Sequence, residues 1–200
     1  MRCPVQPHAY FAYIPAPLIT IYNLQNTQRM KLPLTLVLIL FTVTAFCQDQ
    51  LQKEASGMIT FASAKVVQLV DAVPDDKLDW APADGVRSFR DVFTHIVTAN
   101  YFFGSKLGPA IPASVNMETL AKDLKTKDQL KAALKDSYEF AIAAVRNTKS
   151  ESLPAKVEYP FPGEFTNMSS VLILATHSNE HLGQLIAYAR MNGITPPWSR

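Results

Sequence analysis

Four stretches of the chain repeat apolar residues at the three- and four-residue spacing of an α-helix, and this pattern limits the fold more than any other feature. In the first stretch, Met58, Ala62, Val66, Leu69 and Val73 recur along one helix face. No series of alternating apolar and polar residues competes with this periodicity. The sequence therefore predicts an all-α fold, a four-helix bundle. The expected helices cover 52–73, 89–103, 127–146 and, after a cap at Asn167 or Ser169, the segment up to 191.

Two of the helix starts have the spacing of a capping box. Ser88 is followed three residues later by Asp91, and Thr126 is followed by Gln129 at the same spacing. In this motif the first side chain accepts a hydrogen bond from the third residue's backbone, and the third side chain bonds back. Helices are therefore expected to start directly after Ser88 and Thr126. Gly104 is expected to end the second helix, because glycine often follows the last helical residue.

The connections between the expected helices are long and contain several prolines. Residues 104–116 and 147–166 are longer than the loops of a simple up-and-down bundle. A short helix is expected over 117–124. The prolines within 157–163 exclude a helix there and allow only extended backbone. An extended excursion is thus expected before the last helix.

The first 47 residues differ in composition from the rest of the chain. No acidic residue precedes Asp49, and the 15 residues 32–46 are uncharged and follow a Met-Lys start. A basic start, a short apolar run and an abrupt polar switch are typical of a secretory signal peptide. We predict that 30–47 is such a signal and that it is cleaved before Gln48. The apolar run is shorter than the ~20 residues of a membrane-spanning helix, so no stable span is expected after cleavage.

Other interpretations of this leader remain open. In a lipoprotein Cys47 would accept the lipid, although the bulky Phe46 stands where such signals carry a small residue. Residues 1–29 fit neither a signal nor a domain, and we interpret them as an over-extended start with Met30 as the initiator. A longer hydrophobic anchor would have to include the polar segment 23–31. The expected localisation is exported, either periplasmic or extracellular.

The expected mature domain, residues 48–200, differs from the whole chain in charge and in cysteine content. It has 16 basic and 17 acidic residues and a formal charge of −1, whereas the whole chain has +2. Neither value suggests a nucleic-acid partner, which requires a concentrated basic face. Both cysteines precede residue 48, so the domain must be stabilised by its core without disulfides. A chain of ~150 residues buries about two-thirds of its unfolded surface, which is sufficient.

The mature domain contains three histidines, His95, His177 and His181. The last two are four residues apart on the expected last helix, so both leave the same helix face about one turn apart. His95 lies in the middle of the second helix among mostly apolar neighbours. Three core-facing imidazoles can hold zinc, nickel or iron and leave coordination positions open for water or substrate. The alternative is that they are hydrogen-bonded core residues without a metal.

Residues 177–181 also match the H-x-x-E-H pattern of inverzincin proteases. That class needs another carboxylate ligand far downstream, and none of the 19 residues after His181 is acidic. The pattern therefore does not predict a protease. Glu180 remains a candidate catalytic residue, as a base or a group that borders the metal, and its alternative role is a solvated or interhelical charge.

These residues together resemble the DinB-like metalloenzyme family. The resemblance covers 51–198 and rests on the single histidine of the second helix and on the last-helix motif 177–184. The supporting segments are 78–82, 87–89 and 188–197. The resemblance implies a four-helix bundle that binds a divalent metal, carried over here to His95, His177 and His181.

Members of the family that the chain resembles have a range of activities. They include thiol-dependent S-transferases and a mycothiol-dependent maleylpyruvate isomerase, and dimers are common among them, so a homodimer is expected. The signal peptide departs from this pattern, because low-molecular-weight thiols are chiefly cytoplasmic. We expect an exported metal-dependent hydrolase or thiol/group transferase that acts on a small molecule, with zinc or nickel as its cofactor. The alternative is a non-catalytic metal-binding or stress-associated helical bundle.

Residues near the histidines have expected roles of their own. Gln184 is expected to hydrogen-bond either the bundle interior or a ligand, and Gly183 to allow close approach of another helix. Tyr188 is expected to pack in the core. Asp91 can either orient His95 or a bound water, or form an ion pair with a neighbouring arginine.

Overall fold

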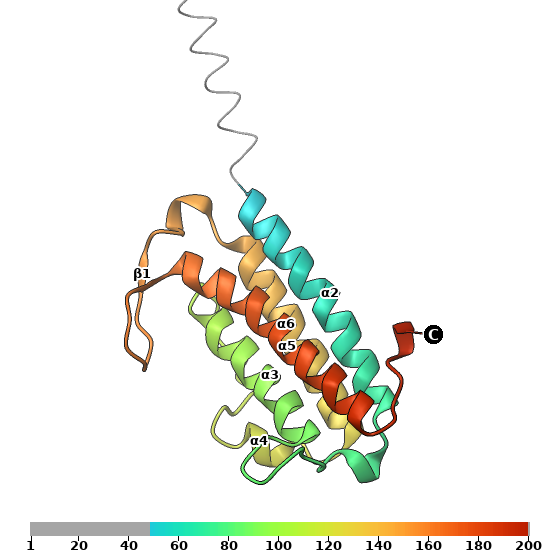
Figure 1. Cartoon of the computed structure of the whole chain (residues 1–200). Helices are drawn as coiled ribbons and strands as arrows, with labels where there is room; N and C mark the ends of the chain where they lie inside the picture. Colours follow the sequence, from blue (N-terminus) through green and yellow to red (C-terminus); the bar gives the residue numbers. More distant parts are fainter. Residues whose placement is uncertain (1–48, 200) are drawn as a thin grey trace, which may run out of the picture. The chain divides into compact units, whose positions relative to one another are not determined.

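The computed structural model describes residues 49–199. The predicted signal peptide 30–47, with Cys47, and the preceding segment 1–29 lie outside these residues. The helices are α2 (Gln50–Ala72), α3 (Phe89–Ser105), α4 (Leu120–Asp123), α5 (Lys127–Asn147) and α6 (Asn167–Met191) (Figure 1). The four long helices confirm the predicted ones, whereas the predicted short helix is reduced to the four residues of α4. Within 49–199, no helix is long and apolar enough to cross a lipid bilayer.

Long-range hydrogen bonds show how the helices run relative to one another. The start of α2 lies beside the end of α5, since Gln52 Nε2 donates to a backbone carbonyl just after α5 (3.0 Å). The start of α3 lies beside the start of α5, where Arg90 donates to the Lys125 carbonyl (2.5 Å). The end of α6 reaches the start of α3, where the Tyr188 hydroxyl donates to the Arg87 carbonyl (3.1 Å). Consequently α2 and α6 run in one direction, and α3 and α5 run in the other.

Each long helix packs against two of the other three. The pairs in contact are α2–α5, α5–α3, α3–α6 and α6–α2, so α2 and α3 are diagonal to each other, as are α5 and α6. Because α3 and α5 are parallel neighbours, the connection between them must return along the bundle before α5 begins. This connection includes α4, which Figure 1 shows at the end of the bundle away from the start of α2. The topology therefore accounts for the length of that connection.

The two predicted capping boxes are confirmed, and the predicted cap of the last helix is wrong. The Ser88 hydroxyl accepts from the Asp91 N–H (3.2 Å), and Asp91 Oδ2 accepts from the Ser88 N–H (3.0 Å). The box at the start of α5 forms in the same way. The cap of α6 is Thr166 rather than Asn167 or Ser169, and Ser169 is its partner in a third box. Thr166 can cap the helix because it leaves the preceding strand with extended backbone angles.

Two glycines have roles different from those predicted. Gly104 does not end α3, which continues to Ser105, and it is buried within that helix. A Cβ at Gly104 would lie 2.8 Å from the Phe140 ring of α5, so this glycine permits close packing of the two helices. Gly183 was expected to allow close helix approach, but it is exposed and a Cβ there would meet no atom within 4 Å. The predicted end of α6 is confirmed, because Gly193 follows it with a φ of +72°.

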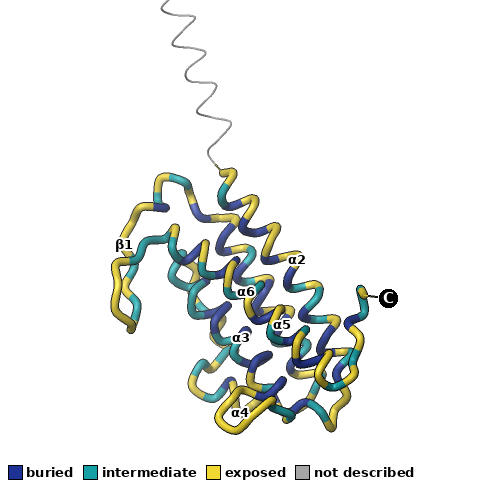
Figure 2. Tube along the Cα trace, in the orientation of Figure 1, coloured by how far each residue is buried: buried dark blue, intermediate teal, exposed yellow. Residues whose placement is uncertain are grey.

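The excursion before α6 is a small antiparallel hairpin formed by β1 (Lys156–Val157) and β2 (Phe165–Thr166). The prolines of 158–164 lie at its tip, outside the two paired strands. Proline has no backbone N–H to donate, and at the tip no strand pairing requires one. The predicted extended backbone is confirmed, whereas the pairing of these strands was not predicted. Figure 2 shows that the tip is mostly exposed.

The buried apolar residues form one cluster between the long helices. In Figure 2 the buried positions follow the helices, whereas exposed positions dominate the hairpin tip and the loop near α4. The apolar stripe of α5 is buried over its whole length and comprises Leu130, Leu134, Tyr138, Ala141 and Val145. The core thus holds α3 and α6 together, and these two helices carry the histidines.

Candidate metal centre

The three predicted histidines meet where α3 packs against α6. His95 comes from α3, and His177 and His181 come from α6 one turn apart. The Nε2 atom of His177 is 3.0 Å from Nε2 of His95 and 3.0 Å from Nε2 of His181. One ring nitrogen of each residue lies within 4.8 Å of the other two. The antiparallel contact of α3 with α6 therefore brings all three imidazoles to one point.

Burial keeps His95 and His177 neutral. His181 is only 5% exposed, and His95 and His177 are half-buried. Burial, followed by the nearby Arg87 guanidinium and His181, lowers the pKa of His95 to about 4. Burial, followed by the neighbouring His181 and His95, lowers the pKa of His177 to about 3. Both rings are neutral near pH 7, which is the state that can bind a metal ion.

Aromatic side chains contribute to the burial of His177. The Phe103 ring of α3 has its centroid 6.2 Å from that of His177. The Tyr159 ring of the hairpin lies 5.5 Å from the Phe103 ring, and its hydroxyl shares a hydrogen bond with Ser170 of α6 (2.6 Å). The hairpin therefore supplies part of the apolar cover on this side of the site.

A chain of hydrogen bonds sets the tautomer of His181. The Arg87 carbonyl can only accept, so the Tyr188 hydroxyl must donate to it (3.1 Å). The Tyr188 oxygen then accepts from Gln184 Nε2 (2.9 Å), which turns Gln184 Oε1 toward Nδ1 of His181 (2.7 Å). Nδ1 must carry the proton, because an amide oxygen only accepts. His181 Nε2 therefore presents a lone pair to the other two histidines.

Hydrogen bonds between the rings cannot account for both close contacts among the three Nε2 atoms. His177 Nε2 can carry one proton, yet it lies 3.0 Å from the nitrogens of both His95 and His181. A single N–H makes one good hydrogen bond and leaves the other close pair without a proton between its nitrogens. A divalent cation accepts all three lone pairs at once. The donor set therefore fits a divalent metal ion.

A hollow of about 320 Å³ opens beside His95. Its lining combines polar and charged side chains from α3 and the loop before it with one residue of α4. The lining residues are Arg87, Asp91, Thr94, His95, Thr98 and Ala121. The hollow lies next to the histidine group.

The family model of the DinB superfamily matches residues 58–185, which is more than half of the chain and includes the three histidines. The chain belongs to the DinB superfamily. Solved structures with the same fold are found at low sequence identity, so their likeness to this DinB-superfamily protein shows the fold. No curated protein matches the chain at a significant level.

Three of these solved structures illustrate the likeness. A DinB-like protein from Bacillus cereus is 20% identical with a TM-score of 0.57, over 69% of this chain and 90% of its own. The DinB-like protein YjoA from Bacillus subtilis is 19% identical with a TM-score of 0.57, over 74% of this chain and 97% of its own. YfiT from Bacillus subtilis, described as "a probable metal-dependent hydrolase with an unusual four-helix bundle topology", is 18% identical with a TM-score of 0.56, over 72% of this chain and 89% of its own.

Two acidic residues of this DinB-superfamily protein lie near the histidines in the sequence. Glu180 is exposed on α6 and does not line the hollow beside His95, so its catalytic role stays a prediction. Asp91 lines that hollow, but its Oδ2 accepts from Ser88 in the capping box. Among the described residues, no ion pair includes Asp91, because Arg90 binds Asp79 instead (2.6 Å).

The sequence did not single out Arg87 and Thr94 as site residues. Asp91 and His95 lie four residues apart on α3, whereas Arg87 precedes the Ser88 cap, so helical spacing does not predict its place beside them. Gln184 is now assigned to the interior, as the hydrogen-bond partner of His181. The signal for Gln184 was the three-residue spacing from His181 on one helix.

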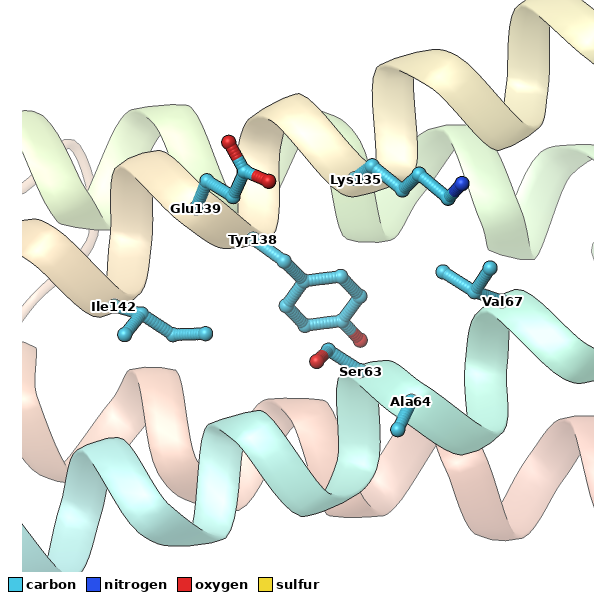
Figure 3. Close-up of a pocket in the computed structure, with 7 residues that line it drawn as sticks. All are labelled: Ser63, Ala64, Val67, Lys135, Tyr138, Glu139 and Ile142. Atoms are coloured by element: carbon cyan, nitrogen blue, oxygen red, sulfur yellow. The ribbon is translucent and has the colours of Figure 1, made fainter.

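A separate hollow of about 390 Å³ lies between α2 and α5 (Figure 3). In Figure 3 the Tyr138 ring points from α5 toward α2, where Ser63 and Ala64 lie. No histidine lines this hollow, and the α2–α5 contact is on the opposite side of the bundle from the α3–α6 contact. It is therefore not part of the candidate metal centre.

Proposed function

We propose that this DinB-superfamily protein is a metal-dependent enzyme of the hydrolase or thiol/group-transferase type that acts on a small molecule. His95, His177 and His181 would hold a divalent ion, zinc or nickel. The observation that carries the proposal is the convergence of their Nε2 atoms, with two separations of 3.0 Å. The description of the structural neighbour YfiT as a probable metal-dependent hydrolase supports the same assignment.

The chemistry of such a site explains why these residues are suited to it. A divalent ion with open coordination positions lowers the pKa of a bound water or thiol, which then acts as a nucleophile near neutral pH. The neutral rings of His95 and His177 and the fixed tautomer of His181 prepare the donor atoms. We assign to Glu180, whose carboxylate is exposed on α6, the transfer of protons between the site and solvent.

Metal analysis of the purified full-length protein tests the proposal most directly. After incubation with zinc or nickel and removal of excess ion, we expect about one metal per chain. His95→Ala and His177→Ala should lose it, whereas Glu180→Gln should keep it, because Glu180 is outside the histidine group. Wild-type protein that stays free of both metals would overturn the proposal.

Activity measurements separate an enzyme from a non-catalytic metal-binding bundle. The metal-loaded protein is screened with thiol-transfer and hydrolase substrates, with His95→Ala as the inactive control. Turnover that is lost in His95→Ala and reduced in Glu180→Gln supports the enzyme and the proton-transfer role. Metal binding without turnover of any of these substrates favours the alternative of a non-catalytic metal-binding bundle.

The proposal also includes export and a homodimer. Export rests on the predicted signal peptide 30–47, and the dimer rests on the family resemblance. Mass spectrometry of the protein from cell fractions should find a chain that starts at Gln48 in the periplasm or the medium. An unprocessed chain in the cytoplasm would contradict export, and a lipid on Cys47 would favour the lipoprotein alternative. Light scattering of the purified protein measures the oligomeric state.

A further inference from the structure

Arg87 presents an unpaired guanidinium at the hollow beside His95. Its side chain is exposed, and none of the ion pairs among residues 49–199 includes it. Its backbone is held in place, because its carbonyl accepts the hydrogen bond from Tyr188 at the end of α6. Arg90, three residues later, has no such freedom, since its guanidinium binds Asp79 and a backbone carbonyl before α5. Arg87 is thus anchored by its backbone and has a guanidinium available for a ligand.

The Asp91 carboxylate lines the same hollow but forms no ion pair with Arg87 among residues 49–199. Asp91 Oδ2 already accepts from the N–H (3.0 Å) and the hydroxyl (2.8 Å) of Ser88. Thr98 donates its hydroxyl to the Thr94 carbonyl (3.0 Å), and the Thr94 hydroxyl is buried without a partner among the described residues. Within residues 49–199 the Arg87 guanidinium therefore has no hydrogen-bond acceptor or ion-pair partner, although a carboxylate lines the same hollow.

We propose that this hollow binds the anionic group of the substrate, a carboxylate or a phosphate, through Arg87. This inference rests on the proposed function, because another atom of the same molecule would react at the histidine centre next to it. A guanidinium offers a planar pair of donors that matches two oxygens of either group. A volume of about 320 Å³ suits a small organic acid or phosphate monoester, since it lies near the lower end of the ~300–1,000 Å³ typical of ligand pockets.

The placement of Arg87 relative to the histidines supports a shared role. Arg87 and His95 line the same hollow, and the Arg87 charge contributes to the lowered pKa of both His95 and His177. The hydrogen bonds from Arg87 through Tyr188 and Gln184 to His181 connect the anion-binding residue with a metal ligand.

Calorimetric titration of acetate and of inorganic phosphate into the full-length protein tests the inference. Each anion is titrated with and without bound zinc or nickel. We expect at least one of the two anions to bind, and Arg87→Gln to weaken that binding about ten-fold or more, as loss of a charge-assisted hydrogen bond typically does. Arg87→Lys should lose part of the affinity, because it keeps the charge without the planar fork. Preference for acetate or for phosphate identifies which anionic group the substrate carries.

Arg190→Gln is the matched control, because it removes another exposed arginine with the same change in net charge. It should bind the anion like the wild type. Equal weakening in Arg190→Gln, unchanged binding in Arg87→Gln, or failure of the wild type to bind either anion would overturn the inference. Thermal unfolding and metal content of each variant show that the fold and the histidine group are intact.

The metal-binding and anion-binding experiments can overturn the two proposals independently. A protein that binds metal but shows no Arg87-dependent anion binding would overturn this inference and leave the proposed function standing. A protein that binds the anion through Arg87 but takes up no metal would overturn the proposed function alone.

Discussion

The orientation of His181 depends on Gln184. Gln184→Leu removes the acceptor for the His181 Nδ1 proton and the donor to Tyr188, so the imidazole is free to turn and present either nitrogen. Loss of a residue that orients a metal ligand typically lowers metal affinity about 10- to 100-fold, and we expect this range for Gln184→Leu. Competition with a chromophoric chelator measures the affinity.

Gln184→Glu is the matched comparison for this prediction. A carboxylate keeps an oxygen acceptor for His181 Nδ1 but cannot donate to Tyr188. Most of the metal affinity should therefore remain in this variant. A Gln184→Leu protein that binds zinc or nickel as tightly as the wild type would show that the tautomer of His181 is set by something else.

The lowered pKa values of His95 and His177 predict how stability changes with pH in the metal-free protein. The pKa of each ring is lowered from the ordinary value of 6.5, to about 4 for His95 and about 3 for His177. Between these values the unfolded chain takes up protons that the folded chain does not, so acidification favours unfolding. This contribution to the free energy of unfolding is fully present above pH 6.5 and is lost as the pH falls toward 4 and then 3.

Urea denaturation in the presence of a chelator measures this effect over the same pH range. Carboxylates also titrate in acid, so the comparison is made with His177→Gln, which lacks the more strongly shifted of the two rings. The variant should show a shallower loss of stability with falling pH than the wild type. Identical pH profiles would mean that His177 titrates normally in the folded protein.

At the residue scale, the sequence predicted what depends on local spacing. His177 and His181 are recognisable because a four-residue step places them on one helix face, and His95 because its neighbours are apolar. Arg87 and Thr94 were not predicted as site residues. Their hollow exists because α4 comes to lie beside α3, and that contact is set by the path of a long connection.

Three glycines within the helices predict different effects of the same substitution. Gly57 and Gly183 have open space where a Cβ would lie, whereas a Cβ at Gly104 would approach Phe140 to 2.8 Å. Glycine inside an exposed helix costs about 0.5–1 kcal/mol relative to alanine, so Gly57→Ala and Gly183→Ala should gain about that much stability. In Gly104→Ala the Phe140 ring must shift, which should cancel the gain and leave the variant no more stable than the wild type.

Urea denaturation of the metal-free variants measures these differences as shifts of the midpoint at constant slope. Phe140→Leu replaces the ring that a Cβ at residue 104 would meet. In that background, Gly104→Ala should recover part of the expected gain in stability relative to Phe140→Leu alone. A Gly104→Ala protein that is as stabilised as Gly57→Ala would contradict the close contact of α3 with α5.

At the scale of elements, helix starts were predicted better than helix ends. The capping boxes at Ser88 and Thr126 are complete within four residues, so the sequence shows them directly. Gly104 has the sequence signature of a helix end. The structure shows that glycine is needed there because the ring of Phe140, which is distant in the sequence, packs against it. The Thr166 cap was missed because the strand before it was expected only as extended backbone.

At the scale of the whole molecule, the order of the helices depends on contacts between distant residues. Gln52 bonds a carbonyl 96 positions later, and Tyr188 bonds a carbonyl 101 positions earlier. Apolar periodicity predicts which face of each helix is buried, but it does not specify which helix covers that face. The bundle could therefore be predicted as a class, while the parallel pairing of α2 with α6 and of α3 with α5 could not.

The histidine centre would join α3 and α6 through residues 82 positions apart, so metal binding should stabilise the entire bundle. A ligand at 100 times its dissociation constant adds about 2.7 kcal/mol to the free energy of unfolding when it binds only the folded state. We expect zinc or nickel to raise the unfolding temperature of the wild type and of Glu180→Gln, because the exposed Glu180 is outside the histidine group. His95→Ala should show little of this increase, since its two remaining histidines lie on a single helix. An equal increase in His95→Ala would mean that the ion binds α6 or another part of the surface, without linking the two helices.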